Sequence, residues 1–180
     1  MAVTPEEVLS FWREAGPDRW YQADSEFDAR VRARFLATHE AAAAGKLAAW
    51  ETTPEGALAL LIALDQFPRN MFRGTARAFA TDPLARAAAD RAIARGFDRA
   101  FPMPERNFCY LPFEHSERLA DQKRSLALCE AAGDADAIKW AKLHLDVIRR
   151  FGRFPHRNEM LGRVSTPEEI AFLEGGGFRA

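Results

Sequence analysis

The stretch from Thr53 to Gln66, TPEGALALLIALDQ, decides the fold class. It begins with threonine, proline and glutamate, which together are a helix-start signal. The threonine caps free backbone N–H groups, and a proline in the first helical position gives up an N–H that would have no helical partner. Leu58, Leu61 and Ile62 then recur at the three- and four-residue spacing of one helix face. The stretch therefore predicts an α-helix with an apolar face directed at a core.

The same start signal recurs along the chain. Thr4-Pro5-Glu6-Glu7 and Thr166-Pro167-Glu168-Glu169 each add a glutamate in the third helical position, from which a side chain can bond back to the capping residue. No stretch shows the alternation of apolar and polar residues that is typical of a β-strand. The apolar spacing predicts helices over residues 5–15, 25–44, 54–66, 75–80, 83–96, 105–110, 116–132, 135–151, 156–162 and 167–174.

Helices of this length joined by short turns favour antiparallel hairpins packed on one another. The sequence therefore predicts an all-α fold of packed helical hairpins, TPR-like in topology and without a β-sheet. With 180 residues and no stretch that reads as a flexible linker, the chain is expected to form one domain over residues 1–180. The tail, residues 175–180, begins with three glycines and is expected to fray.

Composition excludes several classes of partner. Hydrophobic residues make up 48% of the chain and charged residues 28%, which is typical of a globular protein. The formal net charge of −1 gives no bulk attraction to nucleic acid or to an anionic membrane. The longest apolar run, Ala57 to Leu64, falls well short of the ~20 residues of a membrane span. We expect neither a nucleic-acid nor a membrane partner, and the sequence leaves the oligomeric state open.

The cysteines and the first residues of the chain indicate a cytoplasmic protein. Cys109 and Cys129 lie in apolar surroundings and form neither a disulfide framework nor a metal-ligand pair, which suits a reducing compartment. The first residues, MAVTPEEVLSFW, carry acids and lack the basic region of a signal peptide. No glycine-rich phosphate-binding motif is present, and we expect no cofactor.

Asp65 is the most informative single residue. It lies four residues after Leu61, on the apolar face of the predicted helix, and a carboxylate directed at a core must find donors or lose its charge. Arg69 and Arg73 follow at steps of four, with Asn70 between them. We expect Asp65 to be buried and paired with Arg69 or Arg73, either as a structural ion pair that fixes the helix exit or as part of a functional site.

The segment from Arg149 to Arg163 gathers positive charge around a single acid, Glu159. Guanidinium groups at a helix end can hold a phosphate or carboxylate, and the free N–H groups of a following helix would add to the attraction. The alternative is that these arginines are solvated and complement the C-terminal dipole of the preceding helix. The candidate donors are Arg153, His156, Arg157 and Asn158.

A third polar segment, Tyr110 to Glu117, contains Glu114 and His115. Its acids could join His156 in a metal site, but acids in a first helical turn are stabilising without a metal, and no metal-ligand spacing is present. We therefore expect no metal. His144 is interpreted as a hydrogen-bonded core histidine, and His39 as solvated.

Three stretches carry a family resemblance: LDQFPRNMFRGTARAFATD over 64–82, YLPFEHSE over 110–117 with LADQ after it, and RFGRFPHRNEMLGRVSTPEE over 150–169. The sequence resembles the bacterial family called domain of unknown function 924 over nearly its whole length. The resemblance implies a helical, TPR-like fold and no particular catalytic residue. Because its motifs coincide with the three polar segments, we expect those segments to converge into one polar cleft.

These features support three hypotheses about function. The leading one is that an Arg- and His-lined cleft binds a small anionic ligand or a peptide carboxylate, with Arg153, Arg157 and Asn158 as donors. The second is a hydrolase-like enzyme that uses Asp65 or Glu114 with His115 or His156 as acid and base. The third is a helical scaffold whose groove holds a partner helix. The sequence does not decide whether the protein is an enzyme. The predicted site comprises Asp65, Arg69, Asn70, Arg73, Glu114, His115, Arg153, His156, Arg157 and Asn158.

Overall fold

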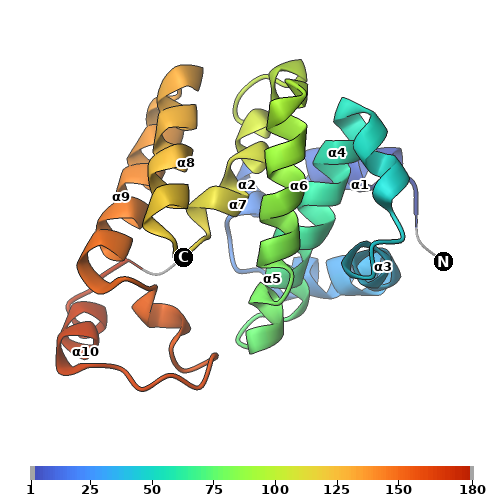
Figure 1. Ribbon diagram of the computed structural model, residues 1–180. Helices are drawn as coiled ribbons and strands as arrows, with labels where there is room; N and C mark the ends of the chain where they lie inside the picture. The colour runs from blue at the N-terminus through green and yellow to red at the C-terminus, as the bar shows by residue number, and fades with distance from the viewer. Residues whose placement is uncertain (1–2, 179–180) are drawn as a thin grey trace. The chain divides into compact units, whose positions relative to one another are not determined.

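A computed structural model describes residues 3–178 (Figure 1). Every regular element in this range is helical and no strand occurs within it, so the predicted all-α fold class is confirmed. The α-helices are α1 (Pro5–Ala15), α2 (Pro17–Trp20), α3 (Ser25–Ala43), α4 (Pro54–Leu61), α5 (Phe67–Met71), α6 (Asp82–Ala94), α7 (Leu111–Glu114), α8 (Leu119–Ala132), α9 (Ala135–Phe151) and α10 (Pro167–Glu174). A π-helical turn, η2, covers Ile62–Gln66, and short 3-10 helices are η1 (Ala48–Thr52), η3 (Ala76–Phe79), η4 (Phe97–Ala100), η5 (Glu105–Cys109) and η6 (Pro155–Arg157).

The start signals set the helix ends as predicted. In α1 the Thr4 hydroxyl accepts a hydrogen bond from the Glu7 backbone N–H at 3.3 Å, and the Glu7 carboxylate accepts one from the Thr4 N–H at 2.8 Å. The same reciprocal pair joins Thr166 and Glu169 at the start of α10. Each pair satisfies two N–H groups that the helix cannot satisfy itself.

The chain forms two compact units. The N-terminal unit comprises residues 1–73 and 77–112, and the C-terminal unit comprises residues 113–180 with 74–76. The single domain expected over 1–180 stays a prediction, as does the TPR-like topology. The tail over residues 175–180 was expected to fray, and residues 179–180 lie outside the described range. Within the described part of the tail, the ring of Phe178 contacts that of His144, with centroids 4.5 Å apart.

An aromatic cluster forms the core of the N-terminal unit. Phe35 of α3 stacks on Phe67 of α5 with ring centroids 4.6 Å apart, and Trp12 of α1 meets Phe67 edge-on at 5.8 Å. Phe27 packs against Trp12 at 6.2 Å. All four side chains are at most 2% exposed. Stacked and edge-to-face rings of this size contribute a large share of core stability, so the cluster holds α1, α3 and α5 together.

The helix predicted over 54–66 departs from regular α geometry at its end. The backbone N–H of Phe67 donates to the Ile62 carbonyl, five residues back, which makes Ile62–Gln66 a π-helical turn. The next residue, Pro68, has no N–H to donate to the Leu64 carbonyl, and a proline ring crowds the carbonyl four residues before it. We attribute the π-helical turn to this proline, because a wider turn relieves the crowding while the chain continues as α5.

The π-helical turn and the proline leave backbone carbonyls without their usual helical donors, and side chains supply the missing hydrogen bonds. The Ala63 carbonyl accepts from His39 Nδ1 at 2.9 Å, and the Leu64 carbonyl accepts from the Thr81 hydroxyl at 2.6 Å. A buried carbonyl without a donor is costly, so these bonds are needed for the turn to be buried.

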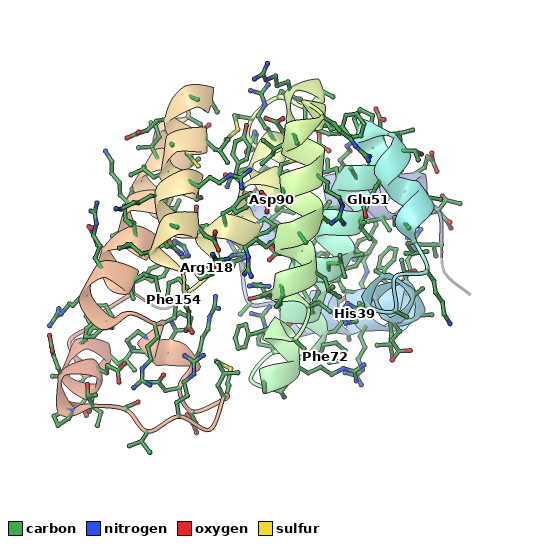
Figure 2. The ribbon with its side chains drawn as sticks, viewed as in Figure 1. His39, Glu51, Phe72, Asp90, Arg118 and Phe154 are labelled. Atoms are coloured by element: carbon green, nitrogen blue, oxygen red, sulfur yellow. The ribbon has the colours of Figure 1, made fainter. Side chains whose placement is uncertain are left out.

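The bond to Ala63 also corrects the interpretation of His39. That histidine of α3 (Figure 2) was expected to be solvated, yet it is only 4% exposed. Burial lowers its pKa, which keeps the ring neutral and leaves Nδ1 as the donor to the Ala63 carbonyl. The expectation was wrong because nothing near His39 in the sequence shows that a carbonyl 24 residues later needs a donor.

The C-terminal unit is built on a helical hairpin. α8 and α9 lie side by side and run in opposite directions (Figure 1), joined through Gly133 in the left-handed conformation. Val147 and Ile148 of α9 pack with Phe154 in the core of this unit. This hairpin agrees with the predicted packing of helices on one another.

Of two helix predictions in the C-terminal unit, one was right except for its start and the other was wrong. The helix expected over 116–132 begins only at Leu119, because the Ser116 hydroxyl accepts the Arg118 N–H and donates to Asp121, which holds an irregular turn. The helix expected over 156–162 is reduced to the single 3-10 turn Pro155–Arg157, followed by turns.

Replacing Thr81 by valine should destabilise the N-terminal unit. Valine has nearly the same shape but cannot donate to the Leu64 carbonyl, so a buried acceptor loses its donor at a cost of about 1–3 kcal/mol. Urea unfolding measures the change. The matched control is Thr52→Val, whose hydroxyl bonds an exposed carbonyl and whose effect should stay within about 0.5 kcal/mol. Equal effects of the two substitutions would contradict this account of the turn.

Candidate functional site

Asp65 lies in the π-helical turn and is buried, as predicted. It is 1% exposed, and its Oδ1 lies 3.3 Å from Nη1 of Arg69. Gln66 Nε2 donates to Oδ2 at 2.6 Å, and the Arg69 guanidinium also donates to the Asp65 backbone carbonyl at 2.6 Å. The predicted pairing with Arg69 is therefore confirmed.

Arg69 is shared between two carboxylates. Its Nη1 and Nη2 donate to the two oxygens of Asp82, at 3.0 and 3.1 Å. The guanidinium thus joins the π-helical turn to the start of α6. This arrangement supports the structural interpretation of Asp65, because each partner is held by groups of the chain itself.

Arg73 and Asn70 meet a different acid from Asp65. Arg73 binds Asp28 of α3 through Nε at 2.7 Å and Nη2 at 3.0 Å, and Asn70 Nδ2 donates to the same carboxylate at 2.8 Å. Arg73, the second candidate partner of Asp65, therefore anchors α5 to α3 instead. Sequence reasoning did not identify Asp28, which lies 45 residues before Arg73.

Two of the three predicted segments meet within the C-terminal unit. The Phe154 N–H donates to the Glu117 carboxylate at 2.9 Å, and Arg157 Nη1 donates to the His115 carbonyl at 3.0 Å. Arg163 completes the Glu117 contact with two hydrogen bonds of 2.8 Å. The remaining segment, with Asp65, belongs to the N-terminal unit, and convergence of all three segments stays a prediction.

Two of the three donors predicted for an anionic ligand, Arg153 and Asn158, hold a carboxylate of the chain itself. Arg153 donates to both oxygens of Glu169, at 2.7 and 2.8 Å, and Asn158 Nδ2 lies 3.2 Å from one of them. Glu169 is 2% exposed, and the hydrogen bonds from Arg153 lower its pKa to about 2. Glu169 thus occupies the anion position between these donors. Sequence reasoning recognised it only as part of the α10 capping box.

A second buried carboxylate, Glu114, contacts a histidine 30 residues later in the sequence. Glu114 is 2% exposed and its Oε1 lies 3.0 Å from Nδ1 of His144, which is 5% exposed. The same Nδ1 lies 2.9 Å from the Trp140 carbonyl. Both neighbours are acceptors, so the hydrogen of the imidazole is on Nδ1 and is shared between them.

Burial lowers the pKa of His144 to about 3. The ring is therefore neutral at pH 7, and its contact with Glu114 is a hydrogen bond and not an ion pair. Because Nδ1 carries the hydrogen, Nε2 presents a lone pair. That atom is buried and has no hydrogen-bond partner among residues 3–178. His144 is a core histidine, as interpreted from the sequence, but its Nε2 acceptor has no donor among the described residues.

The other histidines of this unit gather around the same place. The His115 ring centroid lies 6.3 Å from that of His144, and the His156 centroid lies 5.6 Å from that of Phe154. Phe154, labelled in Figure 2 beside the end of α9, lies 5.7 Å from His144 and edge-on to it. We call the group His115, His144, His156 and Phe154 the histidine cluster.

Gln122 of α8 is a further functional candidate that sequence reasoning missed. It is 0% exposed, and its Nε2 donates to the backbone carbonyls of Glu114 and Ser116, at 2.5 and 2.6 Å. It therefore fixes the turn that carries Glu114 and His115. Gln122 stands between Asp121 and Lys123 in a polar stretch of α8, so its neighbours in the sequence did not mark it for burial.

Among residues 3–178, no three His, Cys, Asp or Glu side chains come together in a way that could hold a metal ion. Cys109 and Cys129 are both buried, and burial raises the pKa of each thiol to about 12, so neither is a thiolate at pH 7. The histidine cluster is thus the group in this unit best suited to polar chemistry.

Two open hollows lie away from the histidine cluster. One, of about 410 Å³, is on the outer face of α9 and is lined by Ala135, Ile138, Lys139, Lys142, Leu143 and Asp146. The other, of about 540 Å³, is on α3 and is lined by Ala29, Arg32, Ala33, Leu36, Ala37 and Glu40. Neither contains a residue of the predicted site. In the range 3–178, no helix has the combined length and apolar character that a membrane crossing requires.

Fold and cluster together define an all-α protein with a buried carboxylate–histidine pair. The family model described as bacterial protein of unknown function, DUF924, matches residues 8–177, and the chain belongs to this family. The solved structure of a protein of unknown function, ATU0120, from Agrobacterium tumefaciens is similar, with a TM-score of 0.93 and 48% sequence identity. The match covers 96% of this chain and 97% of that one. Comparison with curated proteins finds no match.

Replacing Glu169 by glutamine should flatten the acid dependence of stability. The pKa of Glu169 is lowered in the folded protein, so its stabilising effect is complete above the ordinary value of 4.5 and is lost as the pH falls toward 2. Melting temperatures of the native protein and Glu169→Gln between pH 6 and 2 should therefore converge at the acid end. The control is Glu168→Gln, an exposed acid paired with Arg150, for which we expect little change at any pH. Parallel curves for the native protein and Glu169→Gln would show that the Glu169 pairs do not stabilise the unit.

Proposed function

We propose that the C-terminal unit binds a small polar ligand that donates a hydrogen bond to His144 Nε2. The observation that carries this proposal is a buried imidazole acceptor without a donor, on a ring whose tautomer is fixed by Glu114 and the Trp140 carbonyl. A buried polar atom left without a partner is costly. A ligand with a hydroxyl or N–H group would satisfy it.

Charge near the histidine cluster favours a ligand that also carries an anionic group. Arg157 is 4% exposed, its guanidinium carbon lies 4.4 Å from the centroid of the Phe154 ring, and its charge helps to lower the pKa of His144. An anionic group beside Arg157 and His156 would gain from a guanidinium held in a place of low dielectric. We therefore propose a hydroxylated small carboxylic acid as the ligand class.

This proposal moves the predicted anion site. Arg153 and Asn158 were expected to donate to the ligand, but an anion there would have to displace the nearly buried Glu169. Arg157, His115 and His156 from the predicted set stay in the proposal, with His144 added as the acceptor. Asp65, Arg69, Asn70 and Arg73 are left with structural roles.

A second candidate function is acid–base catalysis, favoured by the Glu114–His144 pair. A carboxylate that orients an imidazole through Nδ1 and leaves Nε2 free is the arrangement of a general base. The lowered pKa of His144 favours the ligand-binding candidate. A general base works best with a pKa near the operating pH, whereas burial lowers that of His144 to about 3. A neutral acceptor that binds a donor fits this value better than a base that must gain a proton at pH 7.

Cys109 and Cys129 are buried thiols, which suits a reducing environment, and we propose a cytoplasmic location for this activity.

The experiment compares lactate with propionate, which differ by one hydroxyl. Lactate should shift the His144 Nε2 resonance in ¹⁵N NMR, and propionate should bind about tenfold more weakly because it leaves Nε2 without a donor. His144→Asn is the informative variant, since asparagine keeps a donor near the Nδ1 position and removes the Nε2 acceptor. It should lose the preference for lactate while remaining folded.

The matched control is His39→Asn, which changes a buried histidine of the N-terminal unit and should leave the preference for lactate intact. Equal binding of the two acids, or a preference that survives in His144→Asn, would contradict the proposal. A bell-shaped pH profile for hydrolysis of a lactate ester that is lost in His144→Asn would favour the enzyme instead.

A further inference from the structure

We infer that the ligand of the histidine cluster carries an aromatic ring, and that Phe178 of the chain itself fills the position of that ring. This inference rests on the proposed function and narrows its ligand class to aromatic hydroxy acids. It comes from the segment that follows α10, which the sequence marked only by its glycines.

Aromatic rings surround Phe178 on several sides. Its ring centroid lies 4.5 Å from that of His144 at an interplanar angle of 66°, 6.2 Å from that of His156 at 82°, and 6.3 Å from that of Trp140 at 46°. The contacts with His144 and His156 are edge-to-face, which is a preferred geometry of aromatic pairs, and the contact with Trp140 is tilted. The surroundings of Phe178 are therefore complementary to an aromatic ring in particular, and not only to an apolar group.

The segment carrying Phe178 is anchored to α10 by backbone hydrogen bonds from Gly175 to the Ala171 carbonyl, at 3.0 Å, and from Gly177 to the Phe172 carbonyl, at 2.8 Å. No such bond holds Phe178 itself within the described residues, where it is half-buried and makes ring contacts. The residues before it, Gly175 to Gly177, include one in the left-handed conformation, Gly176 with φ of 78°. Glycines have the widest choice of backbone conformations, so this segment can rotate away with little strain. The ring of a ligand could thus replace the ring of Phe178.

Phe178 cannot satisfy His144 completely. A phenylalanine ring has no strong donor, so it packs beside His144 while Nε2 stays without a hydrogen-bond partner. A ring that bears a hydroxyl would provide the same packing and also supply the donor. A carboxylate on the same ring would add the anionic group proposed for Arg157. A compound such as 4-hydroxybenzoate combines the three features.

Competition between Phe178 and the ligand gives a quantitative expectation. If Phe178 occupies the ring position most of the time, the apparent affinity of the ligand falls by the fraction of molecules in which the position is open. Removing the phenyl ring abolishes that competition. Phe178→Ala should therefore bind 4-hydroxybenzoate about tenfold more tightly than the native protein, which corresponds to about 1.4 kcal/mol.

The test uses the full chain and three probes: 4-hydroxybenzoate, benzoate without the hydroxyl, and lactate without the ring. The native protein should bind 4-hydroxybenzoate more tightly than either of the others, and the amide resonances of Gly175, Gly176 and Gly177 should shift on binding as Phe178 leaves. Phe97→Ala is the control, because Phe97 is also half-buried but belongs to the N-terminal unit. It should leave affinity for 4-hydroxybenzoate unchanged.

The outcomes separate the two proposals. If lactate engages His144 but 4-hydroxybenzoate binds no better, the aromatic inference is overturned and the proposed function stands. If neither hydroxylated probe shifts the His144 resonance, both are overturned. Binding of 4-hydroxybenzoate by Phe178→Ala alone would indicate an engineered cavity and would overturn the claim that Phe178 is displaceable.

Discussion

A proline without a backbone N–H, placed in a fully buried helical run, is the constraint on which the N-terminal unit depends. Pro68 cannot bond the Leu64 carbonyl, and the π-helical turn before it shifts the hydrogen bond of Ile62 by one residue. The carbonyls freed in this way lie in the core, where an unsatisfied acceptor is costly. His39 and Thr81 satisfy two of them from other parts of the unit. A local backbone defect thus dictates which distant side chains must be polar and where they must lie.

Local chemistry made much of this unit predictable. The capping threonines, the prolines at helix starts and the apolar spacing act over four residues or fewer, so a single sequence shows them, and the burial of Asp65 beside Arg69 follows from the same spacing. The π-helical turn was not predictable, because apolar residues in a wholly buried run look alike in α and π geometry. The pairing of Arg73 with Asp28 was not predictable either, since the fold alone determines which opposite charges far apart in the sequence come into contact.

In the C-terminal unit, the cluster of positive charge in the sequence led to a wrong inference about what it binds. Sequence reasoning identified Arg153 and Asn158 as donors and inferred an external anion, although the acid that they bind was already visible in the α10 capping box. Glu169 performs both tasks: its backbone and carboxylate complete the cap, and the same carboxylate accepts from Arg153. A glutamate in a capping box is normally exposed, so nothing in the sequence separated this one from Glu7 of α1. The Glu114–His144 pair could not be predicted from the spacing of residues in the sequence, because it joins two separate helices, α7 and α9.

The balance of donors and acceptors in the C-terminal unit argues for the kind of ligand proposed. Its conspicuous cations already face carboxylates, as in the pairs of Arg153 with Glu169 and of Arg163 with Glu117. By contrast, His144 Nε2, Asn158 Oδ1 and Gln122 Oε1 are buried acceptors without a hydrogen-bond partner among residues 3–178. Buried acceptors raise the energy of the folded state until a donor reaches them. Recognition in this unit therefore gains more from a group that donates hydrogen bonds than from negative charge alone, and the anionic part of a ligand serves to orient the donor toward His144.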